Sequence, residues 1–125
     1  MFNHTVIVGR LGQDPEVRQM RSGEAVLNCT VATTSGYTDR TTGERKEATE
    51  WHRIVAYGPV AETIGRLAKK GTLCLFEGSM HTREYTDKQG MTKKSTELKV
   101  RTSRVLAGGR NEGHGGMAEE EDLPF

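Results

Sequence analysis

The sequence has few of the residues that build metal or disulfide scaffolds, and it has no long apolar run. Among 125 residues there are two cysteines, Cys29 and Cys74, with neither CxxC spacing nor a histidine cluster, which argues against a zinc site or a disulfide framework. No stretch approaches the roughly 20 apolar residues of a membrane helix. The amino end carries no basic-then-apolar signal segment. We therefore expect a reduced, cytoplasmic protein.

Catalytic motifs are also missing. Gly9-Arg10-Leu11-Gly12 is not a phosphate-binding loop, because the GK[ST] ending is absent. We find no nucleophile–base spacing and no acidic cluster suited to a catalytic metal. The four histidines do not form a metal set: His4, His52, His81 and His114. The expectation is a protein without enzyme activity, cofactor or metal.

Charge is distributed unevenly, although the net charge is only +1. All 18 Lys and Arg lie in residues 1–110 together with 12 of the 17 Asp and Glu, so this stretch carries +6 while residues 111–125 carry −5. A basic body favours a polyanionic partner, and an acidic tip favours a basic protein partner. From charge alone, a solubilising surface and tail are an equal alternative.

The hydrophobic pattern predicts one all-β domain over residues 1–107, a Gly-rich linker over 108–118 and an acidic tip over 119–125. The strands expected in it are 5–11, 25–34, 48–57 and 72–79, with a closing hairpin of 81–86 and 91–101. Residues 35–46 read as a polar loop. A helix is expected from Gly58-Pro59 to Lys69-Lys70-Gly71, with an apolar stripe that includes Leu67. One helix between the third and fourth strands favours a five-stranded Greek-key barrel, the OB-fold, with SH3-like barrels and small sandwiches as alternatives.

The third expected strand is the most informative segment. Side chains alternate along a strand, which separates two sets: Trp51, Arg53, Val55 and Tyr57 on one face, and His52, Ile54 and Ala56 on the other. If Ile54 and Ala56 fill the core, an aromatic–cation–aromatic row faces solvent. Such a row stacks on the bases of single-stranded nucleic acid and pairs with its phosphates. The alternative places Trp51 and Tyr57 in the core. His52 faces away from Trp51 in this pattern, and we expect it to be a packing or subunit-contact residue rather than a metal ligand.

Two further aromatic residues lie among basic ones. Tyr37 is in the expected polar loop close to Arg40 and Lys46, and Tyr85 is in the expected hairpin, two residues from Arg83. Aromatic side chains interleaved with basic residues in polar segments are typical of nucleic-acid binding.

Motifs spread along the chain carry a family resemblance: Asn3–Gly12, Gln13–Arg18, Ala32-Thr33, Thr42–Glu44, Glu50–Val55, Ala61-Glu62, Lys69–Gly71, Glu77-Gly78 and Glu119–Phe125. These resemble the bacterial single-stranded DNA-binding protein family over about residues 3–106 plus the tip. The resemblance implies an OB-fold homotetramer that wraps single-stranded DNA in replication, recombination and repair. It also implies recruitment of DNA-processing proteins by the tip and a cytoplasmic, nucleoid-associated location.

The resemblance assigns three groups of site residues. The stacking positions are Tyr37, Trp51, Tyr57 and Tyr85. The basic positions that face DNA are Arg18, Arg40, Lys46, Arg53, Lys70 and Arg83. The partner-binding tip is Asp122, Leu123, Pro124 and Phe125.

Several residues depart from the family pattern. Tyr37 and Tyr85 stand where tryptophan is usual, and Glu84 and Pro59 stand where a base is common. Weaker affinity per subunit or stronger salt sensitivity follows. The linker is short: 11 flexible residues span about 17–20 Å, so the tip stays near the body. An interaction module with weak DNA binding remains the alternative.

Overall fold

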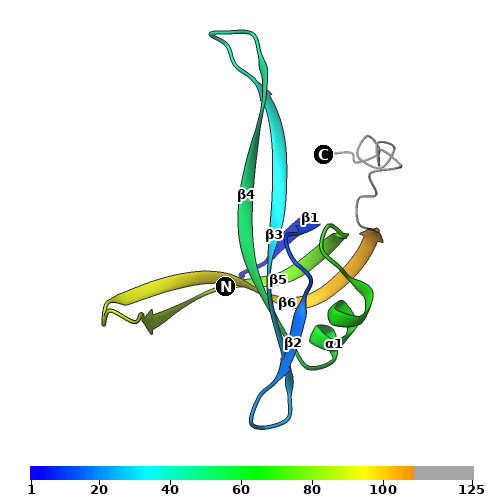
Figure 1. The fold of residues 1–125 in the computed structure, drawn as a ribbon, viewed down its shortest axis with the longest axis vertical. Coiled ribbons are helices and arrows are strands. Elements are labelled where there is room, and N and C mark those ends of the chain that lie inside the picture. The colour runs from blue at the N-terminus through cyan, green and yellow to red at the C-terminus, as the bar shows by residue number, and fades with distance from the viewer. Residues whose placement is uncertain (109–125) are drawn as a thin grey trace.

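The computed structural model describes residues 1–108, so most of the expected linker and all of the tip lie outside the described residues. The elements follow in the order β1 (Thr5–Leu11), β2 (Glu16–Gln19), β3 (Ala25–Thr38), β4 (Arg45–Tyr57), α1 (Gly58–Leu67), β5 (Leu73–Thr86) and β6 (Thr92–Ala107). Figure 1 shows a barrel body from which two long hairpin arms extend. No helix within residues 1–108 is long and apolar enough to cross a membrane.

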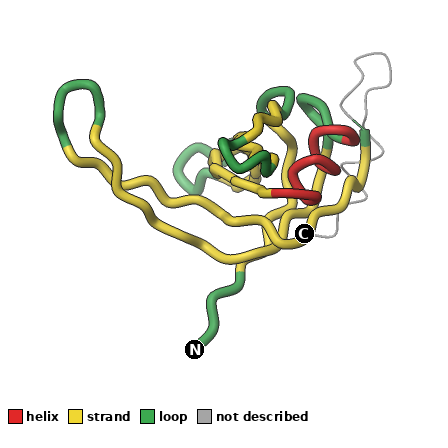
Figure 2. The backbone as a smooth tube through the Cα atoms, turned by 90° about the horizontal axis from the view of Figure 1, so that it is seen from below, coloured by secondary structure: helices red, strands yellow, loops and turns green. Residues whose placement is uncertain are grey.

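Five strands close the barrel. Their order is β1-β5-β6-β4-β3, and β1 pairs with β3 to complete the circuit, while β2 pairs with the outer edge of β3. The pairings are antiparallel except for β4 with β6, which run parallel at Ile54↔Leu98 and Val55↔Lys99. The single helix lies between β4 and β5 and packs against one end of the barrel (Figure 2). The expected OB-fold is confirmed.

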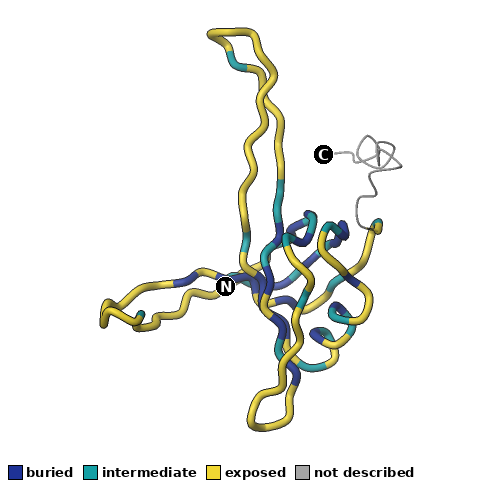
Figure 3. Tube along the Cα trace, viewed as in Figure 1, coloured by how far each residue is buried: buried dark blue, intermediate teal, exposed yellow. Residues whose placement is uncertain are grey.

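The core fills the interior of this barrel. Its largest fully buried side chains come from β3, β4, β5 and β6: Leu27, Val31, Ile54, Cys74, Phe76 and Leu98. Figure 3 shows that burial is concentrated in the body, whereas both arms are mostly exposed. Burial raises the pKa of the Cys29 thiol to about 12 and that of Cys74 to about 11, so both remain protonated at neutral pH.

A glycine permits the barrel to close. A Cβ built on Gly9 of β1 meets the carbonyl oxygen of Ala32 on β3, and a side-chain carbon of Val31 at 2.7 Å. Only a residue without a side chain lets the two backbones approach this closely. The short β1–β3 pairing at Arg10↔Ala32 and Leu11↔Val31 follows directly after this contact.

Helix α1 matches its expected start and differs at its end. Pro59 lies in the first turn, and Ala61 and Ile64 are buried. Leu67, which the sequence placed in the buried stripe, is 54% exposed. Ile64 and Ala68 are four residues apart and therefore lie one above the other on the core side. Leu67 lies at the edge of that side, where the helix ends.

Residues 35–46 are not the polar loop that the sequence predicted. β3 and β4 stay paired out to Thr38↔Arg45, leaving only residues 39–44 as the connecting loop. Likewise, β5 is one continuous strand to Thr86, and β6 runs on to Ala107. Residues 35–46 are mostly polar, so hydrophobicity gives no strand signal there. The backbone ladder and cross-strand contacts such as Thr34 Oγ1 to Thr49 Oγ1 at 3.0 Å hold the arms together.

Candidate nucleic-acid interface

The outer face of β4 presents the aromatic–cation row expected from its alternation. Trp51 is 61% exposed, and Arg53 and Tyr57 are also exposed, whereas Ile54 and Ala56 are fully buried. This confirms the face assignment for these five residues, and the alternative that buries Trp51 and Tyr57 is wrong. Val55 is an exception, because it shares their side by alternation and is only 8% exposed. It lies in the middle of the sheet, between Asn28 of β3 and Lys99 of β6.

Gly12 provides the surface on which the Trp51 ring rests. A Cβ built on Gly12 collides with ring atom Cζ3 of Trp51 and comes within 2.9 Å of Thr30 Oγ1. The Gly12 N–H donates to the carbonyl oxygen of Thr30 at 2.9 Å, which fixes this backbone beside β3. The indole is thus packed on bare backbone while most of its surface stays in solvent.

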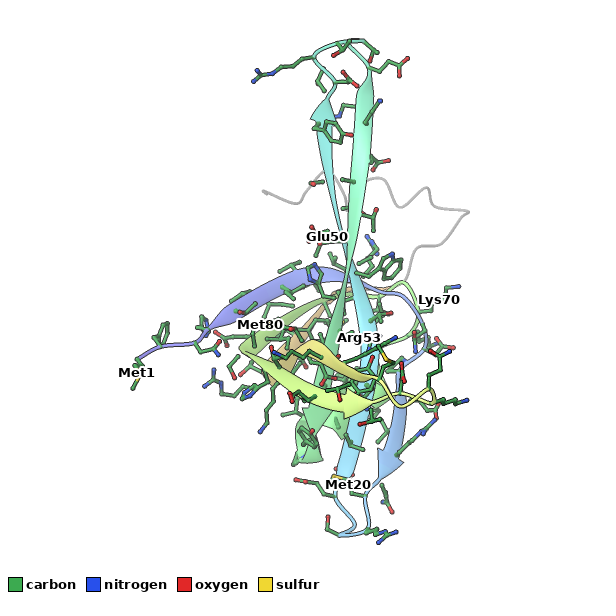
Figure 4. The ribbon with its side chains drawn as sticks, turned by 90° about the vertical axis from the view of Figure 1, so that its left-hand side faces the viewer. Met1, Met20, Glu50, Arg53, Lys70 and Met80 are labelled. Carbon is green, nitrogen blue, oxygen red and sulfur yellow. The ribbon has the colours of Figure 1, made fainter. Side chains whose placement is uncertain are left out.

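A hollow of about 310 Å³ gathers aromatic and basic side chains from three strands. Trp51 and Arg53 enter it from β4, Tyr85 from β5, and Lys94 from β6, with His52, Met80, Ser95 and Thr96 completing its wall. The Arg53 guanidinium reaches Ser95 Oγ at 3.5 Å. Figure 4 shows Arg53 and Met80 near the base of the arms. Aromatic rings and cations therefore converge in one place.

Cations also lie over both tyrosine rings near the hollow. The Arg83 guanidinium is 5.7 Å from the Tyr85 ring centre, and Lys99 Nζ is 5.5 Å from that of Tyr57. Arg83 Nε donates to Glu97 Oε1 at 2.7 Å, and Glu97 is buried. This hydrogen bond and the charge of Glu97 raise the pKa of Arg83 above its usual value. Arg83 is held in place, with part of its charge already neutralised.

The remaining predicted site residues lie outside the hollow. Tyr37 and Lys46 face each other across the β3–β4 arm, and Arg40 lies in its terminal loop. The other two lie on the body, where Arg18 of β2 pairs with Glu16 at 2.7 Å and the Lys70 backbone N–H donates to Asp14 Oδ1 at 2.8 Å. These residues do not form one compact site, and their arrangement is an extended track.

Lys46 carries a local ion pair. Its Nζ lies 3.1 Å from Asp39 Oδ2. The pKa of Asp39 is lowered, first by the backbone N–H of Thr41 and then by Lys46. Among the six predicted basic positions, Arg18, Lys46 and Arg83 therefore have carboxylate partners within the protein.

Sequence reasoning missed three residues of this surface. Lys94 and Lys99 belong to β6, and His52, set aside as a packing residue, lines the hollow and bonds Thr33 Oγ1 through Nε2 at 2.8 Å. The pair Lys93-Lys94 was a usable signal for this surface, because the two lysines lie opposite Tyr85 and Glu84 once the register of the hairpin is set. Within residues 1–108 no group of His, Cys, Asp or Glu is suited to hold a metal ion.

Comparison with known proteins identifies the family. The profile of the Single-strand binding protein family matches residues 2–106. This chain belongs to that family. It is similar to the SSB of Plasmodium falciparum in complex with ssDNA, with 30% identity and a TM-score of 0.72, covering 86% of this chain and 95% of the other.

A second family structure is a deletion mutant of the single-stranded DNA binding protein from Thermus aquaticus. It is 29% identical with a TM-score of 0.72, over 86% of this chain and 51% of the other, so this chain spans about half the length of that protein.

The contact between Gly12 and Trp51 predicts the effect of adding one methyl group. Gly12→Ala should displace the indole, shifting the tryptophan emission and near-ultraviolet circular dichroism, with at most about 1–3 kcal/mol of destabilisation. Gly108→Ala is the matched control, because a Cβ there meets nothing within 4 Å. Identical spectra for Gly12→Ala and the unchanged protein would show that the ring does not rest on Gly12.

Proposed function

We propose that this protein binds single-stranded DNA without sequence preference and protects it during replication, recombination and repair. The observation that carries the proposal is the hollow in which Trp51, Arg53, Tyr85 and Lys94 converge on the outside of the barrel. Membership of the single-strand binding family and likeness to a structure solved with ssDNA support the same conclusion.

The mechanism requires no covalent chemistry. Bases stack on Trp51 and Tyr85, and every base offers a π-face, so stacking does not select sequence. Arg53 and Lys94 neutralise phosphates and release their counterions. Because duplex DNA keeps its bases stacked inside, the protein favours single strands and shifts the melting equilibrium by mass action.

The track continues beyond the hollow. Tyr57 lies in one sheet row with Val26 and Arg18, through the pairings Tyr57↔Val26 and Arg18↔Val26. On the β3–β4 arm, Tyr37 and Lys46 offer a further stacking surface and a cation, with Arg40 at the end. Lys70 extends the basic surface on the body. A DNA strand that follows these positions passes around the barrel.

Assembly into a homotetramer is part of this proposal. Within residues 1–108, the stretch of β1 before Arg10 has β5 on one side and no strand on the other. An unpaired strand edge is a template for pairing with a second copy. Val6 on this strand is half exposed, which also suits an interface.

The tip, Asp122–Phe125, is proposed to recruit replication and repair proteins. Acidic residues next to Leu123 and Phe125 suit a partner with an apolar pocket and a basic rim. Pro124 keeps the segment extended and lowers its cost of ordering. With this activity the protein works where DNA is copied and repaired, in the cytoplasm at the nucleoid.

A module that mainly recruits proteins and binds DNA weakly is the second candidate. It is favoured by the ion pairs of Lys46 and Arg83, whose carboxylate partners compete with phosphates. The rings of Tyr37 and Tyr85, smaller than the tryptophan that is usual at these positions, also favour weak DNA binding. Its distinguishing feature is that loss of Trp51 leaves its function intact.

Removing the exposed indole tests the stacking proposal. Trp51→Ala should weaken binding to poly-dT by roughly 1–3 kcal/mol per engaged base, a range known for base–aromatic stacking in proteins of this kind rather than derived from this structure. Trp51→Phe, which keeps a ring, should lose less. Circular dichroism should show an unchanged fold, since Trp51 is mostly exposed. Unfolding of the alanine variant, or unchanged affinity, would contradict the assignment.

Salt dependence separates phosphate contacts from stacking. The log–log slope of affinity against salt should be about −0.7 for each phosphate neutralised. Lys94→Ala should reduce this slope by about one contact, because within residues 1–108 Lys94 has no carboxylate partner. Lys46→Ala should change it less, because Asp39 already pairs with that lysine. A slope near zero for the unchanged protein would refute the electrostatic part of the proposal.

Truncation tests the role of the tip. A chain without Asp122–Phe125 should keep its affinity for ssDNA or gain slightly, because four residues that include a competing acid are lost. It should no longer retain DNA-processing enzymes from a bacterial lysate. Phe125→Ala is the matched point variant and should lose most of the same proteins. Equal recovery by the full and truncated chains would show that recruitment lies elsewhere.

A further inference from the structure

The β3–β4 arm has two faces, and Tyr37 and Lys46 lie on only one of them. These two residues are opposite each other in the register, so their side chains share a face. The next pair of the ladder joins Thr38 to Arg45, whose side chains point to the other face. Twist of the arm turns both faces together and does not exchange them. Arg45 and Tyr37 therefore lie on opposite sides of the arm.

The face that carries Arg45 continues the Trp51 row of β4. Arg45, Glu47 and Thr49 alternate in phase with Trp51 along this strand. All four are exposed, as is Arg53 at the lower end of the row. At about 3.3 Å per residue, the six-residue separation places Arg45 about 20 Å from Trp51, on the arm that Figure 1 shows extending from the barrel. A DNA strand that leaves the hollow along this face meets Arg45.

Gly36 makes room for the Arg45 side chain. A Cβ built on Gly36 comes within 2.7 Å of Arg45 Nη2 and within 3.2 Å of its Cζ and Nε. The guanidinium thus occupies the space that a side chain at position 36 would fill. It is held against the backbone of β3, across the arm from its own strand.

The backbone conformation does not require a glycine at this position. Within residues 1–108, positive φ values occur at Gly23, Gly43, Gly58, Gly71 and Gly90, and Gly36 is not among them. Glycine weakens the interior of a strand, and it often marks a place where another group approaches the backbone closely. Here that group is the guanidinium of Arg45, just as the indole of Trp51 rests on Gly12.

The charge of Arg45 is available to an outside partner. Within residues 1–108 no carboxylate oxygen lies within 4.0 Å of its guanidinium. The Lys46 ammonium on the other face is, by contrast, 3.1 Å from Asp39 Oδ2. A guanidinium also presents paired donors that match two phosphate oxygens and is more weakly hydrated than an ammonium. Of these two neighbouring cations, Arg45 is the better suited to bind a phosphate.

We propose that Arg45 is the phosphate-binding residue of the arm and that Gly36 positions its guanidinium on the face shared with Trp51, a role that rests on the proposed function. One segment of the DNA strand runs from the hollow along this face, with Glu47 beside it as an opposing charge. Tyr37 and Lys46 contact a separate segment on the far face. DNA then lies on both sides of the arm.

Salt titration of the full chain tests the contact, with Trp51 emission as the readout of oligo-dT binding. Arg45→Ala should lower the log–log slope of affinity against salt by about 0.7, the value for one phosphate. Its deficit in affinity should therefore shrink about 2.6-fold between about 50 and 200 mM salt. Arg45→Lys should keep the slope, because it keeps the charge. Arg66→Ala, which removes an exposed cation from α1, is the matched control and should also keep it.

A methyl group at position 36 tests the positioning. Gly36→Ala should displace the guanidinium without removing its charge, and should weaken binding at low salt by at least about twofold, the lower limit of coupling between residues in contact. In the Arg45→Ala background the same substitution should have no effect. Equal losses in both backgrounds would show that the methyl group disturbs the arm itself, and would overturn the positioning role of Gly36.

Glu47 gives a readout of opposite sign on the same face. Glu47→Gln should tighten binding to oligo-dT, because it removes a negative charge beside the strand. Glu62→Gln removes the same charge from the exposed side of α1 and should tighten binding less. Equal gains from the two variants would show that the strand does not follow the face of Arg45, which contradicts the proposal.

The length of the DNA separates the two faces of the arm. Oligo-dT is varied over about 4–16 nucleotides, the range of site sizes for one OB-fold. Arg45→Ala should begin to weaken binding at a shorter length than Tyr37→Ala, because the Arg45 face is continuous with the hollow. Loss at the same length, or in the reverse order, would refute the assignment of two segments.

The same titrations distinguish this role from the proposed function. If oligo-dT fails to quench Trp51 in the unchanged chain, the proposed function is refuted, and the role of Arg45 with it. If the unchanged chain binds and Arg45→Ala has the same salt slope, only the role of Arg45 is refuted.

Discussion

The alternation of side chains along β4 is the constraint on which the rest of the structure depends. β4 lies between β3 and β6, so Ile54 and Ala56 must fill the barrel interior, where they are fully buried. The same geometry turns Trp51 and Arg53 outward, and no separate device is needed to expose them. Folding of the core therefore also exposes the aromatic–cation row of β4. A shift of one residue in the register of β4 would exchange the two faces and lose both.

The cations around this row differ in whether they have a carboxylate partner within the protein. Arg53 and Lys94 enter the hollow without a carboxylate partner in the described chain, whereas Arg83 and Lys46 are each paired with one. The paired cations are pre-positioned, and Arg83 is held over Tyr85 by Glu97. In the proposed function, contacts of these two residues with phosphate would have to displace or share an internal partner, which lowers the gain from each. The proposed binding then depends mainly on Trp51 and on the cations without a carboxylate partner, Arg53 and Lys94.

The sequence predicted the barrel and the β4 face because both follow from short-range signals. Period-two alternation separates Trp51 from Ile54, and Pro59 with its helical stripe marks the single helix. The outer part of the β3–β4 arm escaped prediction because residues 35–38 and 45–47 are mostly polar and are exposed to solvent. Other features depend on contacts distant in sequence, such as Arg83 with Glu97, and the bulge of β6 at Leu106, which has no partner on β5. Leu67 was wrongly assigned to the buried stripe because the hydrophobic pattern does not show where a helix extends beyond the core that it covers.

Titration of intrinsic tryptophan emission with oligo-dT tests the central claim most directly, because Trp51 is the only tryptophan in the chain. Stacking of a base on the exposed indole should quench the emission strongly and saturably at low salt. Raising the salt concentration should move the curve to higher oligo-dT concentration and leave the saturating quench in place. Emission that stays unchanged up to saturating oligo-dT would contradict the assignment of Trp51 as the stacking centre.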